Sequence, residues 1–207
     1  AAELHRRVQE AASLGATEVC LQGGIHPDYT GQTYLDIVRT VKEAAPDIHI
    51  HAFSPLEIDQ GAATLQLPVS RFLEMLRDVG LRSMPGTAAE VLDEGVRSIL
   101  CPDKVTSQRW LDIMEQAHDV GLHSTATIMF GHVDDARSWV RHWRRVLALQ
   151  QRTQGFTEVV PLPFVSEGAP IYRRGGSRPG PTWREALLMH AVLRLSLGHA
   201  IPNVQAS

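Results

Sequence analysis

Short runs of residues with high β-propensity alternate with longer segments whose apolar positions repeat with a helical period. Turn residues such as Gly, Pro, Asp and Ser adjoin most of the short runs, which is typical of strands. Because parallel neighbours need crossover connections, the alternation predicts a parallel sheet with helices between its strands. The expected strands are Thr17–Gln22, Ile48–Phe53, Arg82–Met84, Ser124–Met129, Thr157–Pro161 and Ile201–Ala206.

The helical segments carry apolar residues at i, i+3, i+4 and i+7, which places these residues on one face, packed against a sheet. Ser70 is expected to cap the second helix, and Gly80 lies just past its end. The chain also opens in a helical pattern. The expected helices are Thr33–Ala45, Ser70–Val79, Thr106–Val120, Arg137–Gln151 and Trp183–Leu197. The stripes expected on the last two are Trp139, Val140, Trp143 and Leu147, and Leu187, Leu188, Ala191, Val192 and Leu195.

The expected strands are polar on one face only. In Ile48–Phe53 a period of two places His49, His51 and Phe53 on one face and three apolar side chains on the other. A strand covered by helices on both faces is apolar throughout, whereas a barrel with a polar ligand in its lumen explains one polar face. The pattern therefore favours an α/β fold, a partial (β/α) barrel of the TIM type with about six β/α units, over a doubly wound sheet. We expect residues 1–207 to form a single barrel domain, truncated at both ends.

Composition and charge restrict the classes of function. The 207 residues carry a formal net charge of −3, which gives no basic field for nucleic acid or anionic membranes. Arg173, Arg174 and Arg178 are interpreted as a solvated loop. No apolar run reaches the ~18 residues of a membrane span, and the first residues do not form a signal peptide. Two cysteines, Cys20 and Cys101, make no disulfide framework, so we expect a cytoplasmic protein.

The first expected strand ends in Gln22-Gly23-Gly24. Two glycines at the carboxyl end of a strand let the backbone turn close to a ligand, with N–H and C=O groups exposed. A plain tight turn explains the pair about as well. Neither GxGxxG nor GxxxxGK[ST] is present, so the sequence predicts no phosphate loop here.

Histidines mark two further strands. His49 and His51 share a strand face, where they either bind a metal or form hydrogen bonds with a polar substrate or with neighbouring polar groups. Glu57, just past that strand, is placed to orient a histidine or receive a proton. His132 directly follows a later strand, where the catalytic side chains of barrels collect, or it caps the next helix around Asp134.

Other polar side chains on the later strands are candidates for substrate contacts: Thr127, Glu158, Asn203 and Gln205. The long segment Val165–Pro181 predicts a lid or binding loop, since such loops are uncommon in compact domains unless they are functional.

Four strings occur in the order and spacing of one known family: Leu21–Asp28 (LQGGIHPD), Ile48–Glu57 (IHIHAFSPLE), Met84–Glu90 (MPGTAAE) and Thr125–His132 (TATIMFGH). Together they resemble the radical S-adenosylmethionine family of deazaflavin and menaquinone biosynthesis, over nearly the whole chain. Three more segments favour the tyrosine-using branch of FO synthases, either a separate subunit or the C-terminal half of the fused enzyme: Gly61–Leu65, Phe156–Val165 and Ile201–Ser207.

The resemblance implies S-adenosylmethionine and a 4Fe-4S cluster as cofactors. It implies radical transfer of the 4-hydroxybenzyl group of L-tyrosine to 5-amino-6-(D-ribitylamino)uracil, followed by ring closure in a partner subunit or fused domain to give the precursor of coenzyme F-420. By position, Gln22, Gly23 and Gly24 match the contact to the methionyl end of S-adenosylmethionine. The matching catalytic groups are His51, Glu57 and His132, and the residues expected to bind the substrate are His49, Thr127, Glu158, Asn203 and Gln205.

One departure from the family pattern is the missing cluster motif CxxxCxxC, which neither Cys20 nor Cys101 matches. We therefore expect the cluster ligands to lie outside these residues, and this chain alone to be inactive and without metal ligands. Three other hypotheses stay open. They are a radical enzyme of the futalosine route to menaquinone, a barrel metallohydrolase with His49 and His51 as an HxH ligand pair, and a non-catalytic binding fragment.

Overall fold

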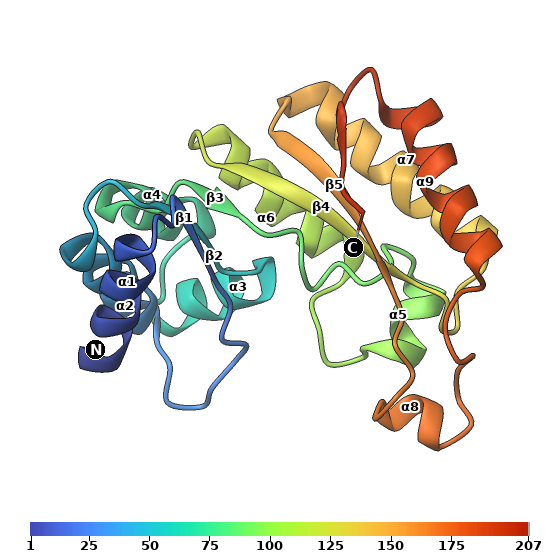
Figure 1. Cartoon of the computed structure of the whole chain (residues 1–207), viewed down its shortest axis with the longest axis horizontal. Helices are drawn as coiled ribbons and strands as arrows, with labels where there is room; N and C mark the ends of the chain where they lie inside the picture. The colour runs from blue at the N-terminus through green and yellow to red at the C-terminus, as the bar shows by residue number, and fades with distance from the viewer. Residues whose placement is uncertain (207) are drawn as a thin grey trace. The chain divides into compact units, whose positions relative to one another are not determined.

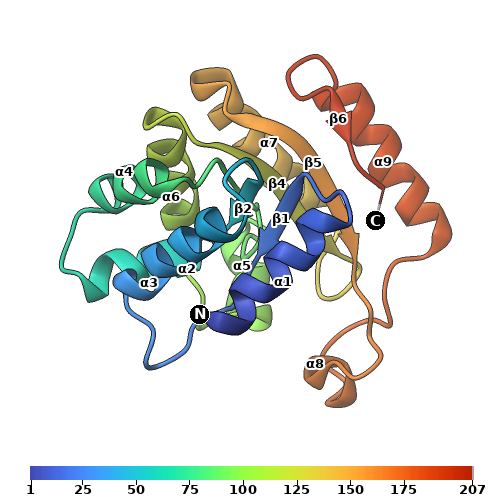
Figure 2. The same ribbon diagram turned by 60° about the vertical axis from the view of Figure 1, so that its left-hand side comes forward.

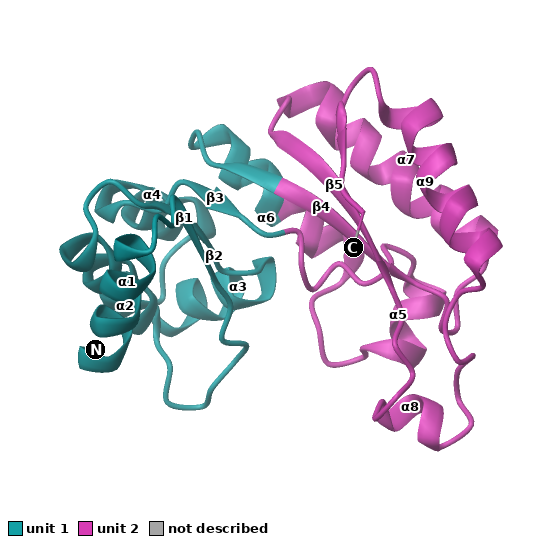
Figure 3. Ribbon diagram, viewed as in Figure 1, with its two compact units in different colours: residues 1–85, 113–124 teal, residues 86–112, 125–207 magenta. Residues whose placement is uncertain are grey.

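The computed structural model describes residues 1–206 and divides the chain into two compact units, which are described separately (Figure 3). The first unit comprises residues 1–85 and 113–124, and the second comprises residues 86–112 and 125–207. Helix α6 (Ser107–Asp119) and strand β4 (His123–Phe130) contribute residues to both. The prediction of a single barrel domain stays a prediction.

In the first unit, strands and helices alternate along the chain (Figure 1). The elements are α1 (Ala2–Ser13), β1 (Glu18–Leu21), α2 (Gly31–Ala44), β2 (His49–Ala52), α3 (Pro55–Thr64), α4 (Val69–Val79) and β3 (Ser83–Met84). Strand β1 pairs in parallel with β2, which aligns Glu18 with His49 and Cys20 with His51. His51 in turn aligns with Ser83 of β3. The parallel pairing expected from the alternation is confirmed.

The second unit continues the same pattern. Its remaining elements are α5 (Glu94–Leu100), α7 (Ala136–Thr153), β5 (Phe156–Pro163), α8 (Pro170–Arg173), α9 (Trp183–Leu197) and β6 (Asn203–Val204). Strands β5 and β6 are parallel, with Glu158 opposite Asn203. The hydrogen-bonded strand order runs from β1 to β6 without a crossing. Helices α7 and α9 lie side by side and line a common apolar groove (Figures 1 and 2).

Strand β2 confirms the predicted alternation and shows where it stops. Ile50 and Ala52 are fully buried, while His49 and His51 are half-buried. The placement of Phe53 on the histidine face is wrong, because the strand ends at Ala52. The Phe53 backbone has a left-handed φ of 66°, and its ring packs against Tyr34 of α2 at 5.0 Å between centroids. The chain therefore leaves the strand at Ala52 and turns into α3.

The buried face predicted from sequence is correct for helix α6 but not for helices α7 and α9. The stripe on α6 is buried as expected, but the stripe proposed for α9 is wrong: Leu195 is 82% exposed, and Leu187 is 54% exposed. The buried side chains of α9 lie at i, i+4 and i+8, and they are Met189, Leu193 and Leu197. On α7 the buried face is likewise shifted, with Val140 exposed and His142 buried. Helix α9 is apolar over a wide arc, so its pattern alone does not fix which stripe faces the sheet.

Two helix boundaries differ from expectation for local reasons. Helix α4 begins at Val69, after Pro68, so Ser70 lies inside the helix rather than at its cap. Gly80 follows α4 with a φ of 123°, as its predicted place past the end requires. Helix α3 was not expected, although Ser54-Pro55-Leu56-Glu57 is a capping-box sequence with proline in the first turn.

Candidate functional site

The loop after β1 exposes the backbone of Gln22, Gly23 and Gly24. Gly24 has a left-handed φ of 65°, and a Cβ built on it meets no atom within 4 Å. This open, turned backbone agrees both with a plain tight turn and with a ligand contact, and the ligand contact stays a prediction. The Gln22 amide lies 3.5 Å from Sγ of Cys20, which is an exposed free thiol.

Glu57 ties this loop to helix α3. Its Oε1 accepts a hydrogen bond from the Gly23 N–H at 3.0 Å. Its Oε2 accepts from the backbone N–H and the hydroxyl of Ser54, both at 2.8 Å, while the Glu57 N–H donates to Ser54 Oγ at 3.3 Å. Only 2% of Glu57 is exposed. With both oxygens occupied, the carboxylate positions the β1 loop, and its predicted catalytic role stays a prediction.

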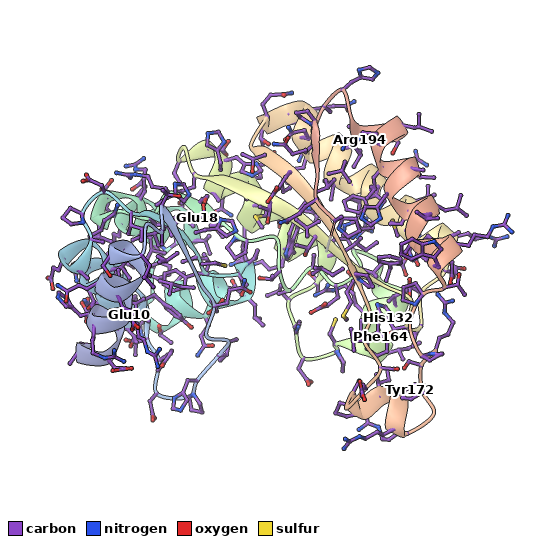
Figure 4. The ribbon with its side chains drawn as sticks, viewed as in Figure 1. Glu10, Glu18, His132, Phe164, Tyr172 and Arg194 are labelled. Atoms are coloured by element: carbon purple, nitrogen blue, oxygen red, sulfur yellow. The ribbon has the colours of Figure 1, made fainter. Side chains whose placement is uncertain are left out.

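His49 and His51 are brought together by a residue that sequence reasoning missed. Nε2 of His49 and Nδ1 of His51 both lie 2.7 Å from the hydroxyl oxygen of Ser83 on β3. A carboxylate oxygen of Glu18, which is labelled in Figure 4, lies 3.6 Å from Nε2 of His49. The polar face of β1–β3 thus carries a continuous row of groups able to form hydrogen bonds. Ser83 was overlooked because β3 has only two residues, too few to show a period.

The charge state of His51 follows from its surroundings. Burial lowers the pKa of His51 below its usual value; the carboxylate of Glu18 opposes this shift, and the neighbouring His49 adds to it. The imidazole is therefore neutral at pH 7 and has a free lone pair for a proton.

His132 lies in the second unit and is fully buried. Its Nε2 lies 2.8 Å from the carbonyl oxygen of Met129, and its Nδ1 accepts the N–H of Val133 at 2.7 Å. Its ring meets Phe164 edge-on, with centroids 5.7 Å apart (Figure 4). Burial lowers the pKa of His132, against the opposing effect of Asp134, so this imidazole is also neutral. Its catalytic role stays a prediction.

Asp134, rather than His132, organises the turn before α7. Its carboxylate accepts the N–H groups of Gly131, at 2.9 Å to each oxygen, and of His132, at 2.6 Å. It also accepts the indole N–H of Trp139. The N-cap of α7 is Asp135, whose side chain accepts the Ser138 N–H at 2.8 Å. The alternative in which His132 caps this helix is therefore wrong.

Thr127 is buried in β4 and holds the loop that follows β3. Its hydroxyl donates to the carbonyl of Gly86 at 2.5 Å, and the hydroxyl of Thr125 accepts the Gly86 N–H at 2.9 Å. A Cβ on Gly86 would lie 2.5 Å from the carbonyl oxygen of Thr125, so only glycine fits. The predicted substrate contact of Thr127 stays a prediction.

The remaining candidates lie on β5 and β6. Glu158 is half-buried, opposite the exposed Asn203. Asn203 Nδ2 donates to the carbonyl of Thr157 at 3.3 Å, and the backbone N–H of Gln205 donates to that of Val159 at 3.0 Å. The side chain of Gln205 is exposed.

The site residues fall in both units. The first unit joins Gly23 to Glu57 and, through Ser83, His49 to His51. The second unit contains the other candidates: Thr127, His132, Glu158, Asn203 and Gln205. The second also contains Arg178, one of the three loop arginines, which forms an ion pair with Glu185 at 2.8 Å. The loop interpretation was thus incomplete for this arginine.

The residues present fit the two implied cofactors unequally. The open backbone at Gln22–Gly24 suits the polar end of S-adenosylmethionine. A 4Fe-4S cluster requires cysteine thiolates, and the chain has only Cys20 and Cys101, which fall in different units. The chain therefore does not fit the cluster. Within residues 1–206, no group of three or more His, Cys, Asp or Glu side chains is placed to hold a metal ion, and no helix is long and apolar enough to cross a membrane.

The chain is similar in sequence to known proteins. The chain is 48% identical over 205 residues to a 5-amino-6-(D-ribitylamino)uracil–L-tyrosine 4-hydroxyphenyl transferase of Methanopyrus kandleri, covering 99% of this chain and 56% of that protein. It is 48% identical over 201 residues to an FO synthase of Streptomyces coelicolor, covering 97% of this chain and 23% of that protein. The chain thus spans about half the length of the first relative and a quarter of the second.

The fold also has a solved counterpart. The crystal structure of methylornithine synthase matches with a TM-score of 0.68 at 19% identity, covering 97% of this chain and 54% of that one. No family model matches the sequence. Together with the parallel strand order, this likeness defines an α/β protein that carries part of a TIM-type barrel. Over nearly its whole length the chain is similar to FO synthases and to a tyrosine 4-hydroxyphenyl transferase, of which it spans only a part.

Proposed function

We propose that this chain is the barrel segment of a radical S-adenosylmethionine enzyme that transfers the 4-hydroxybenzyl group of L-tyrosine to 5-amino-6-(D-ribitylamino)uracil. The observation that carries the proposal is the 48% identity to the Methanopyrus transferase over 99% of the chain. A cytoplasmic location and a ring-closing partner subunit or domain belong to the same proposal.

The polar face of the first unit suits this chemistry. When bound, S-adenosylmethionine supplies the 5′-deoxyadenosyl radical that starts the reaction. The exposed backbone of Gln22–Gly24 binds its methionyl end, and Glu57 fixes that backbone through the Gly23 N–H. Holding the loop in advance lowers the entropy lost on binding.

The candidate polar side chains would serve the substrates. Both substrates bear hydroxyl, amine or amide groups, which must be matched by hydrogen bonds when they leave water. His51 is neutral and receives a proton at its Nε2, which has no hydrogen-bond partner among residues 1–206. The groups proposed to bind the ribityl chain and the uracil are His49, Thr127, Glu158, Asn203 and Gln205.

A segment exchange tests this function. The matching 201 residues of the Streptomyces FO synthase are replaced by this chain, and the enzyme is reconstituted anaerobically with iron, sulfide, S-adenosylmethionine and a reductant. With ring-labelled tyrosine and the ribitylaminouracil, we expect the label to appear in the deazaflavin product by mass spectrometry. The unaltered enzyme, carried through the same steps, is the control.

The proposal fails if the exchanged enzyme folds and holds its cluster but makes no labelled product while the control does. The chain alone serves as a second control. We expect it to form no stoichiometric 4Fe-4S cluster, because two cysteines in different units do not supply the ligands.

A further inference from the structure

We propose that Ser83 couples His51 to His49 as a proton relay, so that a proton taken up at His51 leaves through His49 beside Glu18. The inference rests on the proposed function for its chemical purpose, but its geometry is independent of that function. All four residues belong to the first unit and lie on adjacent strands, β1, β2 and β3.

The Ser83 hydroxyl can link the two imidazoles through one donated and one accepted hydrogen bond. A hydroxyl carries one proton and two lone pairs, so it is able to donate to one ring nitrogen while it accepts from the other. Both nitrogens lie 2.7 Å from Ser83 Oγ, within hydrogen-bond range. In the relay, one imidazole is an N–H donor towards Ser83 and the other an acceptor. Reversing the direction of both bonds moves one proton along the row.

One proton enters the row at His51, and one proton arrives at His49. At the start, Nδ1–H of His51 donates to Ser83, and the Ser83 hydroxyl donates to Nε2 of His49. When Nε2 of His51 receives a proton from the substrate, its Nδ1 proton passes to Ser83 Oγ, and the hydroxyl proton passes to His49. His51 ends neutral with its proton on Nε2, and His49 becomes the cation.

The surroundings favour this direction of transfer. His51 is the more desolvated ring, which disfavours a charge on it. The His49 side chain is 41% exposed, with the Glu18 carboxylate 3.6 Å away, so a cation there is both hydrated and paired. The titratable groups that face His51 are Glu18 and Cys20 of β1 and His49 of β2. The fourth group, Ser83, is not titratable and only passes the proton on.

A test on the chain itself uses Ser83→Ala, with Ser83→Thr as the matched variant that keeps a hydroxyl. Nitrogen-15 spectra of the histidine rings, recorded against pH, report which nitrogen carries the proton. In the native chain we expect the ring shifts of His49 and His51 to change together. In Ser83→Ala the two rings should titrate independently, and Ser83→Thr should restore the coupling.

Identical ring shifts and titration curves in the native chain and Ser83→Ala would overturn the relay. If Ser83→Ala does not fold, His49→Gln breaks the same row at its other end and is read at Nδ1 of His51. A change in the Nδ1 shift supports the relay, and no change refutes it.

The segment-exchanged enzyme provides the second arm. Ser83→Ala should lower kcat about 100-fold with little change in KM, a loss typical of removing general acid–base assistance. The acidic limb of its pH profile should also move, and Ser83→Thr should recover activity. If the enzyme with Ser83 intact makes no product, the proposed function fails, while the ring spectra still decide the relay. If kcat is unchanged in an active Ser83→Ala enzyme, the relay is refuted.

Discussion

His51 in the first unit and His132 in the second are both neutral because of burial, yet their ring nitrogens are bonded differently. Both nitrogens of His132 are hydrogen-bonded to backbone groups, the Met129 carbonyl and the Val133 N–H, and Oδ1 of Asp134 lies 3.2 Å from the Nδ1 that accepts the Val133 N–H. His51 instead bonds to the Ser83 hydroxyl, which turns freely between donor and acceptor. The group that is hydrogen-bonded to each ring, rather than the ring itself, therefore determines whether the histidine stabilises the fold or transfers a proton.

The largest loss of stability should come from removing the ring of His132, because both of its nitrogens are hydrogen-bonded. His132→Ala leaves the Met129 carbonyl and the Val133 N–H without partners and opens a cavity in a fully buried place. Losses of this kind amount to about 3 kcal/mol. Urea denaturation measures the change, and His51→Ala, at a half-buried ring with a rotatable partner, should cost about 1 kcal/mol or less. Equal losses in the two variants would remove the distinction between the rings.

The second effect is a loss of stability in acid, to which His142 of the second unit contributes together with His118, whose pKa is lowered by burial to about 4. Burial lowers the pKa of His142 to about 3, and its Nδ1 accepts the Leu92 N–H at 2.9 Å. The unfolded chain binds a proton near pH 6.5, and the folded one does not until about pH 3. The contribution of His142 to stability should therefore be nearly constant well above pH 6.5 and fall by up to about 1.4 kcal/mol per pH unit below it. This gives a loss of about 2 kcal/mol between pH 6.5 and pH 5.

Urea unfolding at a series of pH values checks this slope. In His142→Gln, which does not titrate, the slope should be reduced by one proton. An unchanged slope would show that His142 is not the group responsible.

A third, smaller effect concerns the loop that Glu57 holds. Glu57→Ala removes the acceptor for Ser54 and Gly23 and should cost about 1.5 kcal/mol, the usual range for a lost helix cap. Hydrogen exchange at the Gly23 amide should accelerate. Glu57→Gln keeps one carbonyl oxygen and should lose less. Unchanged hydrogen exchange at the Gly23 amide in Glu57→Ala would show that Glu57 does not hold this loop.

The smallest effect should appear at the solvent side of the polar row. His49→Gln, at a side chain that is 41% exposed, should change the free energy of unfolding by no more than about 0.5 kcal/mol. Thermal denaturation beside the native chain measures it. If His49→Gln lowered the free energy of unfolding as much as His132→Ala, the polar row of Glu18, His49, Ser83 and His51 would be a structural element of the fold.

Much of this architecture could be predicted from sequence. The alternation of His49 and His51 with Ile50 predicted a strand with one polar face, because period-two patterns survive whenever a single face is buried. The face of α9 could not be predicted, since Leu187, Leu188, Leu193 and Leu195 surround the helix and only packing selects among them.

The candidate site was predictable in its parts but not in its connections. Gly23 and Glu57 were both proposed, yet the bond between them joins positions 34 residues apart, which no local pattern reveals. Ser83 and Asp134 were missed because each is defined by the groups that meet around it in space. For Asp134, a carboxylate shortly before a helix was an available signal, but it pointed equally to Asp135.

The two threonines that bracket Gly86 have a consequence for anyone redesigning this protein. Thr125 and Thr127 bind the N–H and the carbonyl of one glycine as a neighbouring strand would, so side chains hold the loop after β3 to β4, together with the backbone hydrogen bond that the Met129 N–H donates to the Glu90 carbonyl. A library that randomises these two positions to create a new specificity would at the same time remove the hydrogen bonds that hold the loop. Valine is similar to threonine in shape and preserves the volume, but it cannot form these hydrogen bonds.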